Sequence, residues 1–281
     1  MKNWKKILGL GLSAALSLSL LASCGGGATT ESAAPSAPAE SQAVESQGAE
    51  SAAPAELKTV EAGKLHMSTN AAFPPYEMTT DNGGFEGIDV EVAEAIAKKL
   101  GLELVVDDMD FDAAQVAVQQ GKSDICMAGL TVNEERKAVM DFSDTYATGI
   151  QVIIVKEGSD VTLDTLGDQL IGTQRGTTGE TYCTDDYGAD HVVPYDNGIT
   201  AVQALMNDQV DCVVIDSAPA SEFVAANPGL VILDTEYTNE DYAIGFAKGN
   251  TALLEAVNGA LAELTADGTV QSILDKYIVA E

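Results

Sequence analysis

From residue 64 onward, short apolar runs alternate with amphipathic stretches of roughly ten residues, and no other feature constrains the fold as strongly. Helical spacing of apolar residues predicts helices over 89–100, with Asp89 as N-cap and Gly101 as the stop, and over 112–120. Strands that alternate with such helices predict an α/β fold with a mostly parallel sheet. The runs expected to form strands are 64–69, 102–106, 124–128, 149–155, 170–174 and 210–216.

One order of elements occurs twice. A helix, a polar turn and a buried strand follow one another over 117–126 and again over 201–214. Two similar α/β halves predict two lobes. Because ligands of open α/β sheets bind beyond the carboxyl ends of the strands, we expect a binding cleft where the strand ends of the two lobes meet.

Arg136 is the first candidate for a binding residue, since the chain has only two arginines against 44 acidic residues. A guanidinium group presents a fork of donors that matches a carboxylate. The ordinary alternative is an ion pair with Glu134 or a neighbouring acid on a solvated helical turn. Arg136 and Thr131, however, closely follow the buried strand predicted over 124–128, and this position favours a site for an anionic group.

Three further features allow both an ordinary and a functional interpretation. The turn over 175–180 enters a helix whose exposed amides favour anions, but a Gly-rich loop with a Thr cap explains it equally well. Asp216 ends a predicted strand, where it either binds a ligand or caps the next helix. Phe73 and Phe111 either belong to the core or contact a ligand.

The N-terminus has the pattern of an export signal. A basic start, an apolar run over 7–21 and small residues before Cys24 resemble a bacterial lipoprotein signal peptide over 1–23, so Cys24 is the expected lipidated N-terminus. Residues 24–56 are rich in small and polar residues and are expected to form a disordered tether. No other apolar run approaches the length of a membrane span, so the lipid on Cys24 is the expected membrane anchor.

The charge of the chain excludes one class of partner. The first 23 residues carry three lysines and no acid, so the net charge of −30 becomes −33 from Cys24 onward. A chain this acidic is not expected to bind nucleic acid. The three remaining cysteines, Cys126, Cys183 and Cys212, lie in apolar runs or on a predicted helix, and we expect no disulfide framework.

Several short motifs occur in a fixed order along the chain. They are Ala72-Phe73-Pro74-Pro75-Tyr76, Gly87-Ile88-Asp89-Val90-Glu91-Val92, Ala128-Gly129-Leu130-Thr131 with Glu135-Arg136, Asp141-Phe142-Ser143, Gly176-Thr177-Thr178 and Asp216. Together they resemble the bacterial extracellular solute-binding proteins of family 3, which are the polar amino-acid receptors of ABC importers. The resemblance extends from about Leu57 to the C-terminus.

The resemblance implies a two-lobed periplasmic-binding-protein fold of type II, in which each lobe is a mostly parallel sheet flanked by helices. It places hinge crossings near 145–150 and 240–244. Lobe 1 then comprises 57–147 and 244–281, and lobe 2 comprises 148–243. A ligand in the cleft would draw the lobes together, and the closed receptor would deliver it to the permease subunits of an ABC transporter.

The resemblance also assigns roles to residues. The carboxylate of a free amino acid would be held by Arg136 together with the amides of Thr131 and Thr178. The ammonium group would be held by Asp216 and the Gly129 carbonyl. Charge-assisted hydrogen bonds contribute about 1.5–3 kcal/mol each, so these contacts alone could account for much of a micromolar affinity.

The side chain of the ligand is expected to be polar and uncharged. Phe73 and Phe111 would sandwich it, while Asn70 and Gln174 would offer amide groups to it. Asn70 is the main reason, because family members that take cationic amino acids carry an acid at the matching position. Asp112 or Glu77 is an acid that could also reach the pocket, which weakens the case for an uncharged side chain.

The chief alternative is an enzyme that resembles cyclohexadienyl dehydratase, which shares this fold and its carboxylate-binding arginine. Such an enzyme needs an acid or base beside the departing groups. Neither His66 nor His191 suits this role, since both are expected on strands away from the cleft. We therefore expect a monomeric binding protein with no cofactor and no metal.

Overall fold

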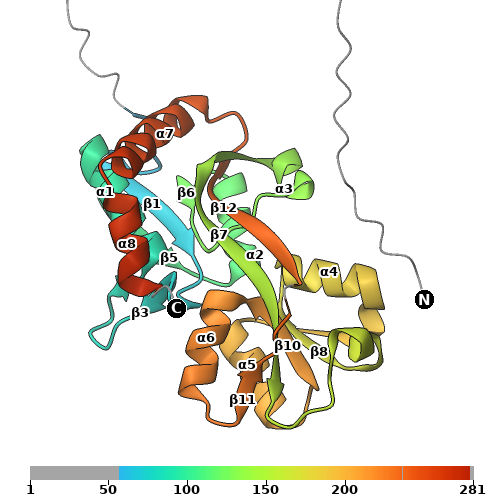
Figure 1. Ribbon diagram of the computed structural model, residues 1–281. Coiled ribbons are helices and arrows are strands. Elements are labelled where there is room, and N and C mark those ends of the chain that lie inside the picture. Colours follow the sequence, from blue (N-terminus) through green and yellow to red (C-terminus); the bar gives the residue numbers. More distant parts are fainter. Residues whose placement is uncertain (1–56, 236, 279–281) are drawn as a thin grey trace, which may run out of the picture. The chain divides into compact units, whose positions relative to one another are not determined.

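The computed structural model describes residues 57–235 and 237–278 (Figure 1). The predicted signal peptide over 1–23, the predicted lipidation site Cys24 and the predicted tether over 24–56 lie outside these residues. Within the described residues, no helix combines the length and the hydropathy that crossing a membrane requires.

Nine strands of the described chain form one sheet in the order β5-β1-β6-β12-β7-β10-β8-β9, with β11 paired to β7. The two ends of this sheet are parallel, as the alternation of strands and helices predicts. A separate antiparallel sheet contains β2 (Ala72–Phe73), β3 (Glu77–Thr79) and β4 (Phe85–Glu86). The strands of the large sheet are β1 (Lys64–Thr69), β5 (Glu103–Asp108), β6 (Ile125–Cys126), β7 (Met140–Lys156), β8 (Ile171–Gln174), β9 (Val192–Tyr195), β10 (Cys212–Asp216), β11 (Leu230–Ile232) and β12 (Thr238–Ala247).

Two long strands, β7 and β12, join the two ends of the sheet (Figure 1). They pair antiparallel, and β7 is 17 residues long. The strand predicted over 149–155 is therefore the last part of a longer strand, because pairing with β12 also holds the Asp141-Phe142-Ser143 motif in extended conformation. The pairing register shifts on either side of Ala243, within one of the predicted hinge segments.

Helices cover both ends of the sheet. Three of them, α1, α7 and α8, pack against one another beside β1 and β5, whereas α4, α5 and α6 accompany β8 and β10. His191 ends a short 3-10 helix rather than lying on a strand as predicted, while His66 does lie on β1. The helices are α1 (Ile88–Leu100), α2 (Phe111–Gln119), α3 (Glu134–Val139), α4 (Thr178–Tyr187), α5 (Gly198–Met206), α6 (Ser217–Ala226), α7 (Thr251–Ala266), α8 (Thr269–Tyr277) and the 3-10 helices η1 (Leu163–Asp168) and η2 (Ala189–His191).

The start of α1 differs from the sequence-based expectation. Gly87, not Asp89, is the N-cap, and a Cβ atom at Gly87 would collide with the Tyr76 carbonyl. Asp89 is the second residue of the helix and is fully buried, and its carboxylate accepts hydrogen bonds from the Gly129 amide at 2.9 Å and the Tyr146 hydroxyl at 2.6 Å. Asp89 thus anchors the loop after β6. Gly101 ends the helix in left-handed conformation, as predicted.

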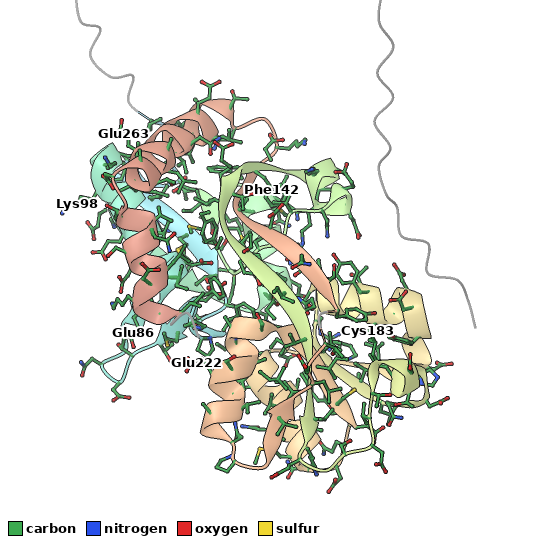
Figure 2. The ribbon with its side chains drawn as sticks, in the orientation of Figure 1. Glu86, Lys98, Phe142, Cys183, Glu222 and Glu263 are labelled. Atoms are coloured by element: carbon green, nitrogen blue, oxygen red, sulfur yellow. The ribbon has the colours of Figure 1, made fainter. Side chains whose placement is uncertain are left out.

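Side chains fill the space between the sheet and its helices (Figure 2). The buried apolar side chains form hydrophobic clusters that include Ile96, Ile153 and Phe246. Burial of each such side chain contributes about 1.5–3 kcal/mol to the stability of the fold. All three cysteines of the described chain are free and buried, in agreement with their position in apolar runs; Cys183 is labelled in Figure 2. The packed core therefore fixes the positions of the strands and helices that carry the polar residues of the pocket.

Candidate functional site

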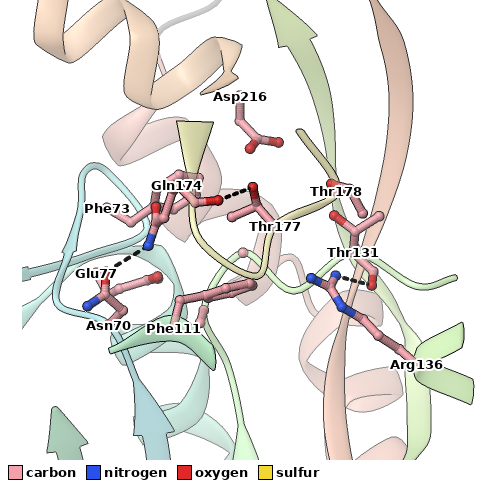
Figure 3. A pocket seen from close by; sticks show the side chains of 12 residues that line it. Asn70, Phe73, Glu77, Phe111, Thr131, Arg136, Gln174, Thr177, Thr178 and Asp216 are labelled. Carbon is pink, nitrogen blue, oxygen red and sulfur yellow. Dashed lines mark hydrogen bonds between the residues drawn. The ribbon is translucent and has the colours of Figure 1, made fainter. Parts of the chain in front are cut away.

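A pocket with an empty volume of about 300 Å³ lies where elements from both ends of the sheet meet (Figure 3). The structure brings all nine candidate ligand-binding residues of the sequence to its wall. They come from segments far apart in the chain, at the ends of β1, β6, β8 and β10, on β2 and α3, and at the starts of α2 and α4. The pocket is lined by Asn70, Phe73, Glu77, Phe111, Ala128, Gly129, Thr131, Arg136, Gln174, Thr177, Thr178 and Asp216.

Arg136 lies on the short helix α3, where Asn133 caps the helix by accepting a hydrogen bond from the Arg136 amide at 2.8 Å. Its guanidinium donates to the carbonyls of Thr131 at 2.7 Å and Gly176 at 3.0 Å, and it lies 5.4 Å above the centre of the Phe111 ring. The ion pair that was the ordinary alternative is not formed, because Glu134 pairs with Lys137 instead. A guanidinium has five N–H donors, so two bonds to carbonyls leave donors for an anion.

The turn before α4 contributes a helix N-terminus to the pocket. Thr177 is the N-cap, and its hydroxyl accepts from the Glu180 amide at 3.3 Å. Thr178 is the first residue of the helix and is 3% exposed, so its amide is one of the helix donors that lack a partner within the helix. The turn therefore has the Thr cap of the ordinary interpretation and, beside the pocket, the amides on which the functional interpretation depends.

Asp216 ends β10 and occupies the N-cap position of α6, yet its side chain makes no capping hydrogen bond. Its carboxylate instead accepts from Gln151 Nε2 at 2.9 Å and from the Tyr242 hydroxyl. Burial raises the pKa of Asp216 to about 7, and the neighbouring Glu240 carboxylate adds to this rise. Capping alone does not explain this residue, since its carboxylate turns into the protein.

Two residues beside Asp216 were not identified from the sequence. Gln151 on β7 and Glu240 on β12 are 1% and 5% exposed. Gln151 Nε2 donates to Glu240 Oε2 at 2.9 Å, and the Thr131 hydroxyl donates to the same oxygen at 3.0 Å. The single amide within the apolar run 150–155 was a signal for Gln151, whereas Glu240 lies among other acids and had none.

One wall of the pocket depends on a close approach between Phe73 and Gly129. A Cβ atom at Gly129 would lie 2.7 Å from Cε1 of Phe73, and Gly129 has a φ of +53°. Phe73 also stacks on Tyr76 with ring centroids 5.9 Å apart. Glycine is required here because any side chain would displace the ring from the pocket wall.

The part of the pocket that is lined by Asn70, Gln174 and Glu77 is polar. Gln174 Nε2 donates to Asn70 Oδ1 at 3.1 Å, and Asn70 Nδ2 donates to the Met109 carbonyl at 2.9 Å. Glu77 is fully buried, and neither of its carboxyl oxygens has a hydrogen-bond partner among the described residues. Burial and then the nearby Asp89 carboxylate raise the pKa of Glu77 well above its ordinary value.

The pocket thus combines a cationic fork, a carboxylate on a different element, two aromatic rings and a polar end (Figure 3). A small zwitterion fits this chemistry, because the fork matches a carboxylate and the acid matches an ammonium group. Arg175, the second arginine of the chain, lies away from the pocket, where it is half exposed and donates to the Pro194 carbonyl at 3.3 Å.

Comparison with known proteins identifies related chains. The family model of the bacterial extracellular solute-binding proteins, family 3, matches residues 65–280. The L-cystine-binding protein TcyJ of Escherichia coli strain K12 is 30% identical over 228 residues, which cover 80% of this chain and 86% of that protein.

Two solved structures of an ancestral arginine-binding protein are also similar. The structure with glutamine bound is 40% identical, has a TM-score of 0.74, and is matched over 78% of this chain and 100% of its own. The structure with arginine bound is 41% identical, has a TM-score of 0.73, and is matched over 77% and 98%. These likenesses confirm the two-lobed type II fold, and the relatives are solute-binding proteins rather than enzymes.

Proposed function

The chain belongs to the bacterial extracellular solute-binding proteins, family 3, and on that basis we propose that it is the substrate-binding lipoprotein of an amino-acid ABC importer. In this role it binds the zwitterion of a polar amino acid between its lobes and delivers it to the permease subunits. The related proteins named above bind cystine, arginine or glutamine according to their names, which supports an amino acid as the ligand class.

The observation that carries this proposal is the placement of Arg136 and Asp216 in the same pocket on different elements, α3 and β10. The guanidinium, with the amides of Thr131 and Thr178, holds the ligand carboxylate. Asp216 and the Gly129 carbonyl hold the ammonium group. One zwitterion thereby contacts both lobes and stabilises the closed arrangement.

For the ligand side chain we propose first an uncharged polar group. Asn70 and Gln174 present amide groups, and the rings of Phe73 and Phe111 pack on either side. Glu77 is compatible with this ligand, because a carboxyl group that keeps its proton both donates to and accepts from an amide.

A cationic side chain is the second candidate, and Glu77 is the observation that favours it. A guanidinium or ammonium group placed beside this buried carboxyl group would supply the partner that its oxygens lack among the described residues, and would favour its ionised form. The relatives include an ancestral protein solved with glutamine and with arginine, so both candidates have support.

The remaining parts of the assignment concern the chain outside the pocket. We propose a lipoprotein signal over 1–23, a tether over 24–56 and a lipid on Cys24 that anchors a monomeric receptor to the extracytoplasmic face of the membrane. Lobe 1 comprises 57–147 with 244–281, and lobe 2 comprises 148–243. The ribbon of β7 and β12, which crosses between the two ends of the sheet, supports hinges near 145–150 and 240–244.

Calorimetric titration with single amino acids tests the function. The protein is unfolded and refolded first to remove any bound ligand. Calorimetry is suited to this chain because Trp4, its only tryptophan, lies in the predicted signal and cannot report lobe closure. Micromolar or tighter binding of glutamine alone supports the uncharged side chain, binding of arginine supports the cation, and no binding across a panel of amino acids contradicts the proposal.

A further inference from the structure

Glu240 is buried beside the pocket without lining it. It lies on β12, in the ribbon between the two ends of the sheet, and is 5% exposed. Its Oε2 atom accepts from the Thr131 hydroxyl at 3.0 Å and from Gln151 Nε2 at 2.9 Å. Its Oε1 atom is buried and has no hydrogen-bond partner among the residues described. A negatively charged carboxylate in this buried position lowers the stability of the folded protein unless its charge is balanced.

Gln151 holds Glu240 next to Asp216. Its Nε2 atom donates to Asp216 Oδ2 and to Glu240 Oε2, each at 2.9 Å. A primary amide has two hydrogens, so both are used in joining these carboxyl groups. Two carboxylates that share a buried site cannot both ionise freely, because each charge opposes the other.

The charged and titratable groups around this pair do not neutralise it. Arg136 from α3 is the nearby cation, and its single positive charge faces two carboxyl groups while its guanidinium bonds to two backbone carbonyls. Tyr242 donates its hydroxyl to Asp216, and Tyr182 from α4 and Tyr76 also face the pair with neutral phenols. The raised pKa of Asp216 follows from this arrangement, with burial as the largest cause and Glu240 as the next.

We propose that Glu240 is a positioning residue of the amino-acid pocket, that its carboxyl group, held beside Asp216 by Gln151, keeps one proton on Asp216 in the unliganded protein, and that the ligand's ammonium group takes the place of this proton. On binding, the proton leaves the carboxyl pair for the buffer, and an ion pair forms between Asp216 and the ammonium group. No other bond changes. This inference rests on the proposed function, because it assigns the ammonium group to Asp216.

Two measurements test whether Glu240 keeps a proton on Asp216. The first is a carboxyl ¹³C NMR titration of the ligand-free protein, which needs no amino acid. We expect a resonance of the pair to titrate well above the ordinary aspartate range and to move down by at least about one pH unit in Glu240→Gln. The matched control is Glu263→Gln, which removes the same charge from an exposed glutamate that pairs with Lys99.

The second measurement is calorimetry of glutamine and arginine binding in buffers of different ionisation enthalpy. Wild-type protein should release up to about one proton per amino acid near pH 7, and affinity should fall roughly tenfold per pH unit below the pKa of the pair. Glu240→Gln should still bind but release fewer protons, whereas Glu263→Gln should behave as wild type.

The outcomes separate this inference from the proposed function. Binding without proton release by wild-type protein overturns the inference and leaves the function standing, and this result needs no variant that must fold. Equal proton release by wild-type protein and Glu240→Gln overturns it as well. A raised titration in the NMR experiment that Glu240→Gln lowers, together with no binding of either amino acid, supports the proton on Asp216 and contradicts the function instead.

Discussion

Nη2 of Arg136 donates a hydrogen bond to the Gly176 carbonyl at 3.0 Å, which joins α3 to the turn before α4. The residues on either side of this bond belong to opposite ends of the sheet. Neither carbonyl bound by Arg136 is charged, and no carboxylate among the described residues forms an ion pair with the guanidinium, so its positive charge can still pair with an anion at the pocket wall. A ligand carboxylate would meet that charge between the two ends of the sheet.

Arg136→Ala should abolish amino-acid binding. Removing the buried cation leaves the ligand carboxylate unpaired, and truncation of one partner of such a pair costs about 2–5 kcal/mol. Calorimetry measures the loss, and urea unfolding checks that the fold persists. Arg175→Ala is the matched control, because it removes the exposed arginine and should leave affinity unchanged. Unchanged affinity in Arg136→Ala would remove this residue from the site.

Asp216→Asn should discriminate between ligands. Its loss weakens the contact to the ammonium group, so amino acids should lose at least about 2 kcal/mol of binding free energy while carboxylic acids without that group lose little. Competition titrations with matched pairs of such compounds give both values. Equal losses for the two classes would contradict the role of Asp216 as the ammonium partner.

Glu77→Gln should separate the two candidate side chains. The variant keeps the shape of the side chain and its hydrogen-bonding capacity but cannot become negative, so glutamine affinity should change by less than about 1 kcal/mol. Arginine affinity should fall by more than about 2 kcal/mol if Glu77 contacts a guanidinium group. Similar changes for both amino acids would place Glu77 outside the side-chain contacts.

Gly129→Ala should destabilise the protein by about 1–3 kcal/mol, because the new Cβ atom meets the Phe73 ring and φ is positive. Gly259 provides the opposite case within the same chain. It lies inside α7, where a Cβ atom would meet nothing within 4 Å, so Gly259→Ala should stabilise by about 0.5–1 kcal/mol. Urea unfolding of both variants measures the difference, and an unaffected Gly129→Ala would show that the Phe73 ring moves freely.

Stability should increase on mild acidification. Burial raises the pKa of Asp89 to about 6 and that of Asp216 to about 7, so the folded protein binds these protons more tightly than the unfolded chain. The resulting stabilisation is complete below the ordinary carboxyl pKa and is lost as pH rises through the folded values. Between about pH 7.5 and pH 5 the free energy of unfolding should rise by about 1–3 kcal/mol. Asp89→Asn should reduce this slope, and a slope of opposite sign would contradict the account.

The sequence was most informative where one segment carried the signal. The scarcity of arginine marked Arg136, and the end of a strand marked Asp216 as either a ligand partner or a helix cap, whereas Gln174 was assigned through the family resemblance. The prediction that Asp89 caps the helix was wrong, because the partners of its carboxylate, the Gly129 amide and the Tyr146 hydroxyl, come from other segments. Local spacing alone cannot reveal such partners.

Glu240 escaped detection for a related reason. Its contacts to Thr131 and Gln151 depend on the register between β7 and β12, whose paired residues are up to about a hundred positions apart. A register shift of one residue would turn its side chain to the opposite face of the sheet. Nothing within the stretch 238–247 specifies that register, so the pair of carboxyl groups is apparent only in the folded structure.

The return of α7 and α8 to α1 has a consequence for the order of folding. As the chain leaves the ribosome from its N-terminus, the strands and helices from β8 to β11 are complete while the cover of α1 is still missing. The half of the sheet that is synthesised first is therefore the last to complete its packing, after α8 has left the ribosome. Contacts of such wide sequence separation form slowly, so a nascent chain that ends before Thr251 would expose the apolar face of α1 to aggregation or to chaperones.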